Sequence, residues 1–440
     1  MSVVGLLTLS LAGCATEGAS GEAAGSASPR NDRTLEAQRA LTAALAPVQG
    51  KVRVRRPLVR GGDAPTDRVD PPYDHSGTEI AKMAAPELET IRRNEALSDW
   101  PEQAVAGAKR VVFADLEAGE EREYEFTSEE MGKMWGEAQA RGINAPSQAA
   151  GPEADALGLL PGPGTQGLSN GYDSRVSKAI STTYTTFDNW LQRAGQVNDT
   201  CSGTLVGRRL VLTAAHCVVS STLAVGTQTF RPRRSGATAP FGAPSTSSYW
   251  YDSQLVSNNC HITYTSGNRE TCGKWDWALL LLPDNAWTGS PNGTPGWAGY
   301  YVPGGTDMTT NNYARNDGYP ACGLGWSPSG CVANTPYGET VGRASYNFRG
   351  PDPGDGNAAT VFNTGNDMTP GHSGSAIWSN TYPDASGPYA LALITNEFCG
   401  LCTTAENPGY STTDKQYPTM VRRITPWLAG FITNNRASYP

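Results

Sequence analysis

One six-residue segment carries most of the information in this sequence: residues 212–217, which read LTAAHC. Residues 200–212 predict a strand, a turn and a second strand, so that His216 comes at a strand end. The small residues Ala214 and Ala215 allow a tight turn that presents the imidazole ring. Imidazole is the usual base for a nucleophilic serine because it is neutral near pH 7. On this segment alone, His216 could equally be a core residue or a metal ligand.

A second segment supplies a partner for such a histidine. Residues 275–282 read WDWALLLL and place Asp276 at the mouth of an apolar strand. A carboxylate buried beside such a strand must be paired, and holding an imidazole is one way to pair it. Because Asp residues are also common in caps and turns, this signal is moderate when taken alone.

A third segment contains a serine between glycines. Residues 369–378 read TPGHSGSAIW, with Ser373 flanked by Gly371 and Gly374. Gly371 allows a backbone turn barred to other residues, so that amide N–H groups can converge on one point, and Gly374 leaves room for a substrate. A Gly-x-Ser pattern alone is commonly a plain turn.

Together the three segments resemble the motifs of chymotrypsin-like serine proteases, and they follow the family's order of His, Asp and Ser. α/β-Hydrolases and subtilisins use other orders. The resemblance covers about residues 176–433 and implies an all-β fold of two antiparallel Greek-key barrels, about residues 176–296 and 297–440. It also implies a C-terminal helix with Thr425 as its cap and proline in its first turn.

The resemblance assigns a role to each residue. Ser373 would attack a peptide carbonyl, His216 would take and return its proton, and Asp276 would orient His216. The amides of Gly371 and Ser373 would form the oxyanion hole. No cofactor and no metal is expected.

Departures within the motifs indicate a branch of the family. His372 stands where the trypsin branch has the Asp that receives the freed N-terminus, so that activation mechanism is not expected. The Gly-x-Ser-Gly-Ser form and residues 173–176 resemble the bacterial glutamyl-endopeptidase branch. Asp367 occupies the position of the carboxylate that binds Lys or Arg in trypsin-like enzymes, although a structural turn explains it equally well. Thr395 stands where glutamate-binding members carry His, so glutamate specificity is not expected.

Eight of the nine cysteines lie after residue 170. An even set in a Gly-rich region of low charge fits disulfides and an oxidising compartment. The resemblance implies the pair Cys201–Cys217, and short loops favour Cys260–Cys272, Cys322–Cys331 and Cys399–Cys402. The last pair, a Cys-x-x-Cys, could instead be half a zinc site or a redox pair.

The first 170 residues differ in charge from the rest, with 17 Lys and Arg against 25 Asp and Glu, whereas residues 171–440 hold 17 of each. Residues 1–14 form a short apolar run ending in Leu-Ala-Gly-Cys, which resembles a bacterial signal and lipobox without a basic start and predicts lipid on Cys14. Residues 15–30 predict a flexible tether. Residues 161–175 predict a linker and processing region.

Residues 31–160 predict a small acidic α+β pro-segment. Strands are expected at 109–113 and 121–126, and a capping box at 127–130 begins a helix. The basic run 51–60 predicts a strand with a solvated face. This unit has no set of residues typical of catalysis, so we expect it to aid folding or block the cleft until cleavage near residue 175.

The sequence therefore predicts a secreted or envelope-anchored serine endopeptidase, made as a precursor and acting as a monomer on proteins or peptides. The pro-segment would be its partner within the same chain. A net charge of −8 argues against nucleic acid as a partner. Two alternatives stay open: a catalytically silent binding or adhesion protein, and an esterase with the same triad.

Overall fold

The computed structural model describes three parts of the chain: residues 40 and 44–58, residues 108–147, and residues 175–440 with gaps. The gaps are 184, 187, 221–222, 224–225, 247, 262–271, 304–313, 323–326, 329, 342–348, 352–358, 365, 380–386 and 398–418. The predicted signal, lipobox and tether, most of the linker, and the pair Cys399–Cys402 lie outside the described residues.

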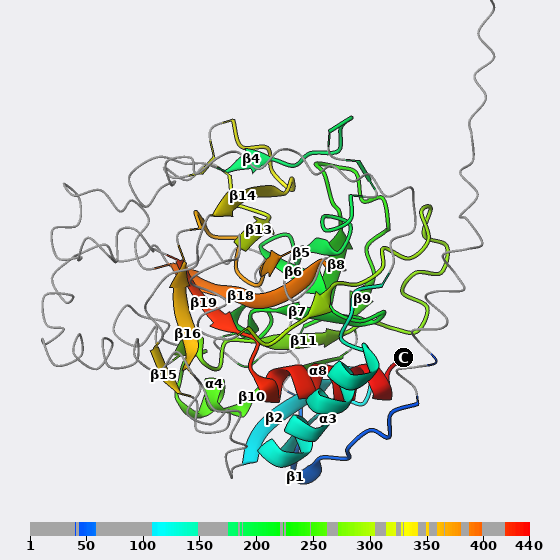
Figure 1. The fold of residues 1–440 in the computed structure, drawn as a ribbon, viewed down its shortest axis with the longest axis vertical. Helices are drawn as coiled ribbons and strands as arrows, with labels where there is room; N and C mark the ends of the chain where they lie inside the picture. Colours follow the sequence, from blue (N-terminus) through cyan, green and yellow to red (C-terminus); the bar gives the residue numbers. More distant parts are fainter. Residues whose placement is uncertain are drawn as a thin grey trace, which may run out of the picture.

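Two sheets dominate the molecule (Figure 1). The first sheet has the strand order β1-β3-β2-β10-β11-β7-β6-β5-β8-β9. Its strands are β1 (Lys51–Pro57), β2 (Ala108–Asp115), β3 (Glu120–Thr127), β5 (Ala194–Val197), β6 (Cys201–Leu205), β7 (Leu210–Thr213), β8 (Gln228–Pro232), β9 (Ser245–Thr246), β10 (Ser248–Asp252) and β11 (Ala278–Leu281).

The second sheet has the order β15-β16-β19-β18-β17-β13-β14-β4, with β12 added beside β18. Its strands are β4 (Val176–Ser177), β12 (Gly299–Tyr300), β13 (Ala314–Gly318), β14 (Tyr337–Val341), β15 (Arg349–Pro351), β16 (Ala359–Thr364), β17 (Ala376–Ser379), β18 (Tyr389–Glu397) and β19 (Thr419–Arg423). This mainly β architecture with a C-terminal helix confirms the predicted fold class, although neither sheet closes into a barrel within the described residues.

The central strands of the first sheet, β7, β10 and β11, are buried on both faces, which explains the uninterrupted apolar run in β11. Successive side chains of a strand point to opposite faces. Leu279 and Leu281 accordingly belong to one core cluster, with Leu212 of β7, whereas Ala278 and Leu280 belong to a second. An alternating pattern would leave one face polar, so the Leu-rich sequence is the one that suits this central strand.

The N-terminal residues continue this first sheet. Strands β2 and β3 form the predicted hairpin, and helix α3 (Ser128–Arg141) begins at the predicted capping box of Thr127 and Glu130. Strand β2 also pairs with β10, which lies more than 130 residues later in the chain. The described part of residues 31–160 is thus joined to the protease-like region, a connection that no local pattern revealed.

Helix α8 (Pro426–Ser438) has the predicted cap, because the Thr425 side chain accepts a hydrogen bond from the Leu428 N–H. Residues 427–437 are all buried, and α8 packs beside α3 (Figure 1). Among the described residues, no helix is long and apolar enough to span a bilayer.

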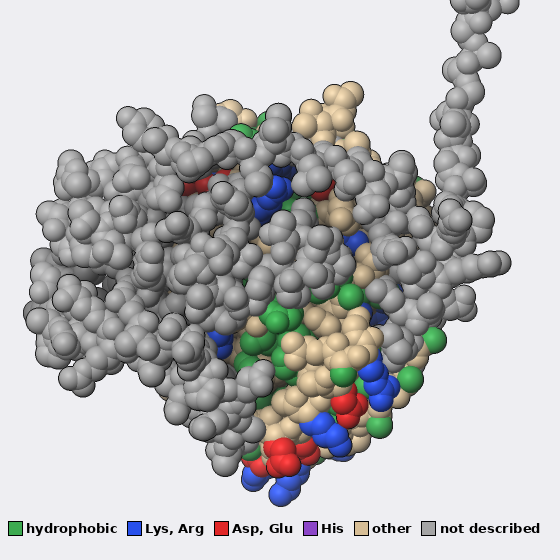
Figure 2. All heavy atoms as spheres, viewed as in Figure 1, with side chains coloured by type: hydrophobic (Ala, Val, Ile, Leu, Met, Phe, Trp, Pro, Cys, Tyr) green, Lys and Arg blue, Asp and Glu red, His purple; other side chains and the backbone are tan. Residues whose placement is uncertain are grey.

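The outer strands carry charges of both signs. The described side chains of β1 at residues 51–53, 55 and 56 are exposed, in keeping with the solvated face that its basic sequence predicts, and Arg53 pairs with Glu125 of β3. Arg110 of β2 lies 3.4 Å from Glu123 of β3. Blue and red side chains lie close together at the lower end of the face in Figure 2, where Figure 1 shows β1, β2 and helix α3.

Three of the expected disulfides are present: Cys201–Cys217, Cys260–Cys272 and Cys322–Cys331. The first joins β6 to the short helix η3 (Ala215–Cys217), which contains His216. A covalent link between these elements limits how far the segment around His216 can move.

Candidate active site

His216 is held by two hydrogen bonds to one carboxylate. Its backbone N–H donates to Asp276 Oδ1 at 2.9 Å, and its ring Nδ1 lies 2.7 Å from Asp276 Oδ2. Asp276 is fully buried, while 23% of the His216 side chain is exposed. The carboxylate therefore holds the ring by Nδ1, so that Nε2 is the nitrogen on the other side of the ring.

Strand register explains how residues 60 positions apart meet. Strand β11 pairs with β7, with Ala278 opposite Thr213. Asp276 comes two residues before Ala278, and His216 comes three residues after Thr213. The antiparallel pairing brings these two strand ends together at one edge of the first sheet.

Ser373 lies in the loop between β16 and β17 of the second sheet, and it is buried. The loop turns at two glycines with positive φ, Gly371 at 98° and Gly374 at 83°. A Cβ on Gly374 would lie 2.2 Å from Thr213 Oγ1, and one on Gly371 would lie 2.2 Å from the Tyr319 carbonyl oxygen. Both positions therefore require glycine for conformation and for space.

Ser202 of β6 ties this loop to the first sheet. Its N–H donates to the Ser373 carbonyl at 2.8 Å, and its hydroxyl donates to the Gly371 carbonyl at 2.7 Å. The Cys217 sulfur, next to His216, lies 3.8 Å from the same Ser373 carbonyl oxygen. The loop of Ser373 thus lies against β6 and against Cys217, the residue next to His216.

Two amides of the loop are left without an acceptor. The His372 N–H donates to the Thr369 carbonyl at 3.0 Å, and the Gly374 N–H donates to the Ile394 carbonyl at 2.8 Å. Within the described part of the chain, the N–H groups of Gly371 and Ser373 donate to no protein atom. These are the two donors that an oxyanion hole at Ser373 requires.

Comparisons with known proteins agree with this geometry. Residues 179–266 match the trypsin family model, in the part of the chain that contains His216. A glutamyl endopeptidase from Bacillus licheniformis is 28% identical over 206 residues, which cover 46% of this chain and 52% of the relative. The chain thus spans about half the length of that relative. In sequence the chain is thus similar to trypsin-family serine proteases.

Two solved structures are also similar to this chain. One is a Glu endopeptidase in complex with MPD, with 16% identity and a TM-score of 0.41 over 61% of this chain and 99% of that chain. The other is the protease Anisep from Arthrobacter nicotinovorans, with 17% identity and a TM-score of 0.35 over 57% and 98%.

His372, at the position where the trypsin branch has Asp, is buried beside strand β13 of the second sheet. Its ring contacts Gly318, where a Cβ would lie 2.7 Å from Cδ2, and its Nδ1 accepts from the Thr369 N–H at 3.4 Å. Burial and then the neighbouring Arg175 lower the pKa of His372 well below the ordinary value. The ring is therefore neutral and packed in the core, which suits a structural role.

Arg175, in the predicted processing region, is also buried beside this loop. Its Nη1 donates to Thr369 Oγ1 at 3.0 Å, whereas Val176 is 50% exposed. A protease reaches the bond between them only after Arg175 leaves this position. Neither this contact nor the bridging role of Ser202 leaves a sequence pattern by which it could have been found.

The two predicted specificity residues are both buried. The Asp367 N–H donates to the Glu339 carboxylate, and the Thr395 hydroxyl donates to the Met420 carbonyl at 3.3 Å. Gly273 lies beside Thr395, since a Cβ on it would be 3.5 Å from Thr395 Oγ1. The loop closed by the disulfide Cys260–Cys272 therefore ends next to this residue.

One group of residues in the described part of the chain brings three metal-binding side chains together: Cys201, His216 and Cys217. The two cysteines form a disulfide, so neither offers a thiolate. With Nδ1 of His216 engaged by Asp276, this group does not suit a metal ion.

Proposed function

We propose that this chain is a serine endopeptidase that cleaves proteins or peptides through an acyl-enzyme. The observation that carries the proposal is the hydrogen-bonded pair of His216 and Asp276, set against the loop of Ser373 by Ser202. Nucleophilic catalysis by serine needs a base whose outer nitrogen is free and whose inner nitrogen is fixed. The similarity of residues 179–266 to the trypsin family and of the chain to a glutamyl endopeptidase supports the same reaction.

The proposed reaction has two halves. Ser373 Oγ attacks the peptide carbonyl carbon while its proton passes to Nε2 of His216, and the N–H groups of Gly371 and Ser373 stabilise the oxyanion. The C–N bond then breaks, the proton passes to the leaving amine, and an acyl ester remains on Ser373. Water attacks this ester with His216 again as base, which releases the acid and restores the serine.

The proposal includes where the protein works and how it is made. Three disulfides suit an oxidising, extracytoplasmic compartment, and lipid on Cys14 would anchor the chain to a bacterial envelope. A cut within residues 161–175 would convert the precursor. The Bacillus relative is named a glutamyl endopeptidase. In this chain the buried Thr395 offers no positive charge to a glutamate side chain, so we propose cleavage of peptide bonds without glutamate specificity.

The test is labelling with a fluorophosphonate, which reacts only with an activated serine, followed by intact-mass analysis. The wild-type protein should gain one adduct, and Ser373→Ala should gain none. The same substitution should lower kcat for a peptide substrate about 10⁴-fold or more. Ser257→Ala, at an exposed serine of helix α4 (Ser253–Ser257), is the matched control and should label like the wild type.

The other outcomes identify the alternatives. No adduct on a protein cut within residues 161–175 would overturn the proposal in favour of a binding or adhesion protein. An adduct with turnover of esters but not of peptides would identify an esterase. The unlabelled mass also gives the mature N-terminus.

A further inference from the structure

The contacts of the N-terminal residues carry a conclusion about the mature protein. From them we infer that residues 108–147 are a permanent part of the folded domain and stay bound after a cut in the linker that follows. The working protein would then consist of two chains held together without a covalent link. This inference does not depend on the proposed catalysis.

The first support is the position of β2 within the sheet. Strand β2 lies between β3 and β10 and pairs with β10 over five residue pairs, from Val111 with Asp252 to Asp115 with Ser248. All five residues of β10 are buried. Loss of β2 would turn β10 into an exposed edge with unpaired N–H and C=O groups, which natural sheets avoid.

The second support is the contact between helices α3 and α8. A Cβ on Gly430 would lie 1.9 Å from the Met131 carbonyl oxygen, so the two helix backbones touch. Phe126, just before α3, packs edge-on against Phe431 with ring centroids 5.4 Å apart. Helix α8 is buried on every side, and a helix of this kind is stable only when protein surrounds it. Removal of α3 would expose its apolar surface to water.

The third support is a buried ion pair across the same interface. Lys109 Nζ of β2 lies 3.1 Å from Asp252 Oδ2, and the two side chains are 3% and 0% exposed. Lys109 also lies over the ring of Trp427, 5.1 Å from its centroid. Removing one partner from a buried pair leaves a desolvated charge, so separation here is strongly unfavourable.

The fourth support is at the end of the segment, directly before the linker. The Ser147 N–H donates to the Trp297 carbonyl at 3.0 Å, and the Trp297 N–H donates to Ser147 Oγ at 2.7 Å. Arg193 donates to the Ser147 carbonyl. The segment is thus fixed up to its last described residue, so a cut further along would not loosen it.

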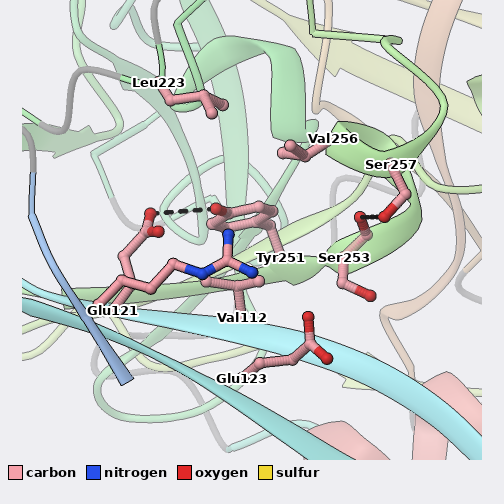
Figure 3. A pocket seen from close by; sticks show the side chains of 9 residues that line it. Val112, Glu121, Glu123, Leu223, Tyr251, Ser253, Val256 and Ser257 are labelled. Atoms are coloured by element: carbon pink, nitrogen blue, oxygen red, sulfur yellow. Dashed lines mark hydrogen bonds between the residues drawn. The ribbon is translucent and has the colours of Figure 1, made fainter. Parts of the chain in front are cut away.

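The interface is less tightly packed in one place, shown in Figure 3. A pocket lies between β3, β10 and α4, lined by Glu121, Glu123, Tyr251, Ser253 and Val256 among others. The Tyr251 hydroxyl donates to the Glu121 carboxylate at 3.1 Å across the interface (Figure 3). This pocket borders only part of the interface and leaves the contacts of Lys109, Met131 and Ser147 unaffected.

The experiment uses the full chain with a recognition sequence for a site-specific protease inserted between residues 163 and 164, in the Ser373→Ala background. This background prevents self-cleavage and keeps the result independent of the proposed function. After complete cutting, gel filtration without denaturant should give one peak that contains both pieces in equal amounts. Release of the N-terminal piece, with the remainder still monomeric and unchanged in circular dichroism, would overturn the inference.

A matched pair of substitutions checks which contacts hold the pieces together. In the cut protein, Lys109→Ala should raise the dissociation constant of the N-terminal piece at least about 100-fold, because the buried Asp252 carboxylate loses the positive charge that balances it. Arg110→Ala, whose pair with Glu123 is exposed, should change it less than about fivefold. Equal dissociation constants for the two variants would contradict the interface described here.

Discussion

The two sheets bring different chemistry to the same site. The first sheet provides His216 and Asp276, and aromatic contacts dominate its core, such as Trp250 with Phe113 at 4.4 Å and with Phe431 at 5.5 Å. The second sheet provides Ser373, and it buries many charged or polar side chains: Asn316, Asp317, Glu339, Asn366, Asp367, His372, Arg422 and Arg423.

The difference separates two sources of stability. Apolar packing is insensitive to pH, and in the first sheet it depends on residues 108–147, which supply Phe113 and Phe126. Buried polar groups are stable only when each is paired, and their pairing changes with protonation. We therefore expect loss of apolar contacts to have its larger effect in the first sheet and a change of pH to have its larger effect in the second.

The joint between the sheets should be the most sensitive place. Gly374→Ala would put a methyl group 2.2 Å from Thr213 Oγ1 at a backbone φ of 83°. We expect the unfolding free energy to fall by about 4–6 kcal/mol, because the cost of backbone strain and the cost of overpacking are added together. Fluorophosphonate labelling should be lost as well. Urea denaturation measures the fall in unfolding free energy. Gly236→Ala is the control, because its φ is 59° but no atom lies within 4 Å, and it should cost only about 1 kcal/mol.

A truncation in the first sheet tests its dependence on apolar packing. Phe126→Ala should lower the unfolding free energy by about 3–5 kcal/mol, by the same amount at pH 5 and pH 8, because no titrating group is removed. Val52→Ala on β1, where the side chain is 42% exposed, should cost less than about 0.5 kcal/mol. If the loss of unfolding free energy in Phe126→Ala varied strongly with pH, the proposed difference between the two sheets would be wrong.

A substitution in the second sheet tests its sensitivity to pH. Burial raises the pKa of Asp317 to about 6, although Trp378 Nε1 donates to it at 3.0 Å. A carboxyl whose pKa is raised by folding costs stability once it is ionised in both states, and costs nothing when protonated in both. Asp317→Asn should therefore stabilise the protein by up to about 3 kcal/mol above pH 6, with the gain falling to zero below about pH 4.

Thermal melts at pH 4 and pH 8 measure this gain. Asp284→Asn is the control, since that side chain is 87% exposed, and its effect should be below about 0.5 kcal/mol at both pH values. A gain for Asp317→Asn that was the same at both pH values would show that its charge is not the cause.

The smallest effect is expected at the interface between the N-terminal segment and β10. Burial raises the pKa of Glu121, which accepts a hydrogen bond from Tyr251. Glu121→Gln keeps an acceptor and removes the charge, so it should stabilise the protein at neutral pH by less than about 1 kcal/mol, with no gain in acid. Thermal melts from acidic to neutral pH would detect this gain in stability. A Glu121→Gln protein less stable than the wild type at pH 7 would contradict the predicted stabilisation.

Local features of the fold could be predicted, and distant contacts could not. The hairpin of β2 and β3 and the capping box at Thr127 depend on residues within one turn of each other, so their patterns are visible in the sequence. The pairing of β2 with β10 depends on two apolar strands that would suit many partners. Neither strand sequence identifies the other as its pairing partner, and for this reason the sequence predicts residues 31–160 as a separate unit.

The candidate site divides in the same way. His216, Asp276 and Ser373 stand in distinctive local motifs, and the structure brings the first two into contact. Ser202 and Arg175 contact the loop of residues 369–373 through their side chains, at positions where the local sequence pattern would accept other residues. Their roles follow from the three-dimensional packing alone.

The contact between α3 and α8 also sets when this protein can finish folding. Helix α3 ends at Arg141 and α8 begins at Pro426, 285 residues later. At the usual rate of synthesis, about 5–20 residues per second, the apolar face of α3 waits roughly 15–60 seconds for its partner to be made. The contact of α3 with α8 therefore forms only after the residues between the two helices have been made.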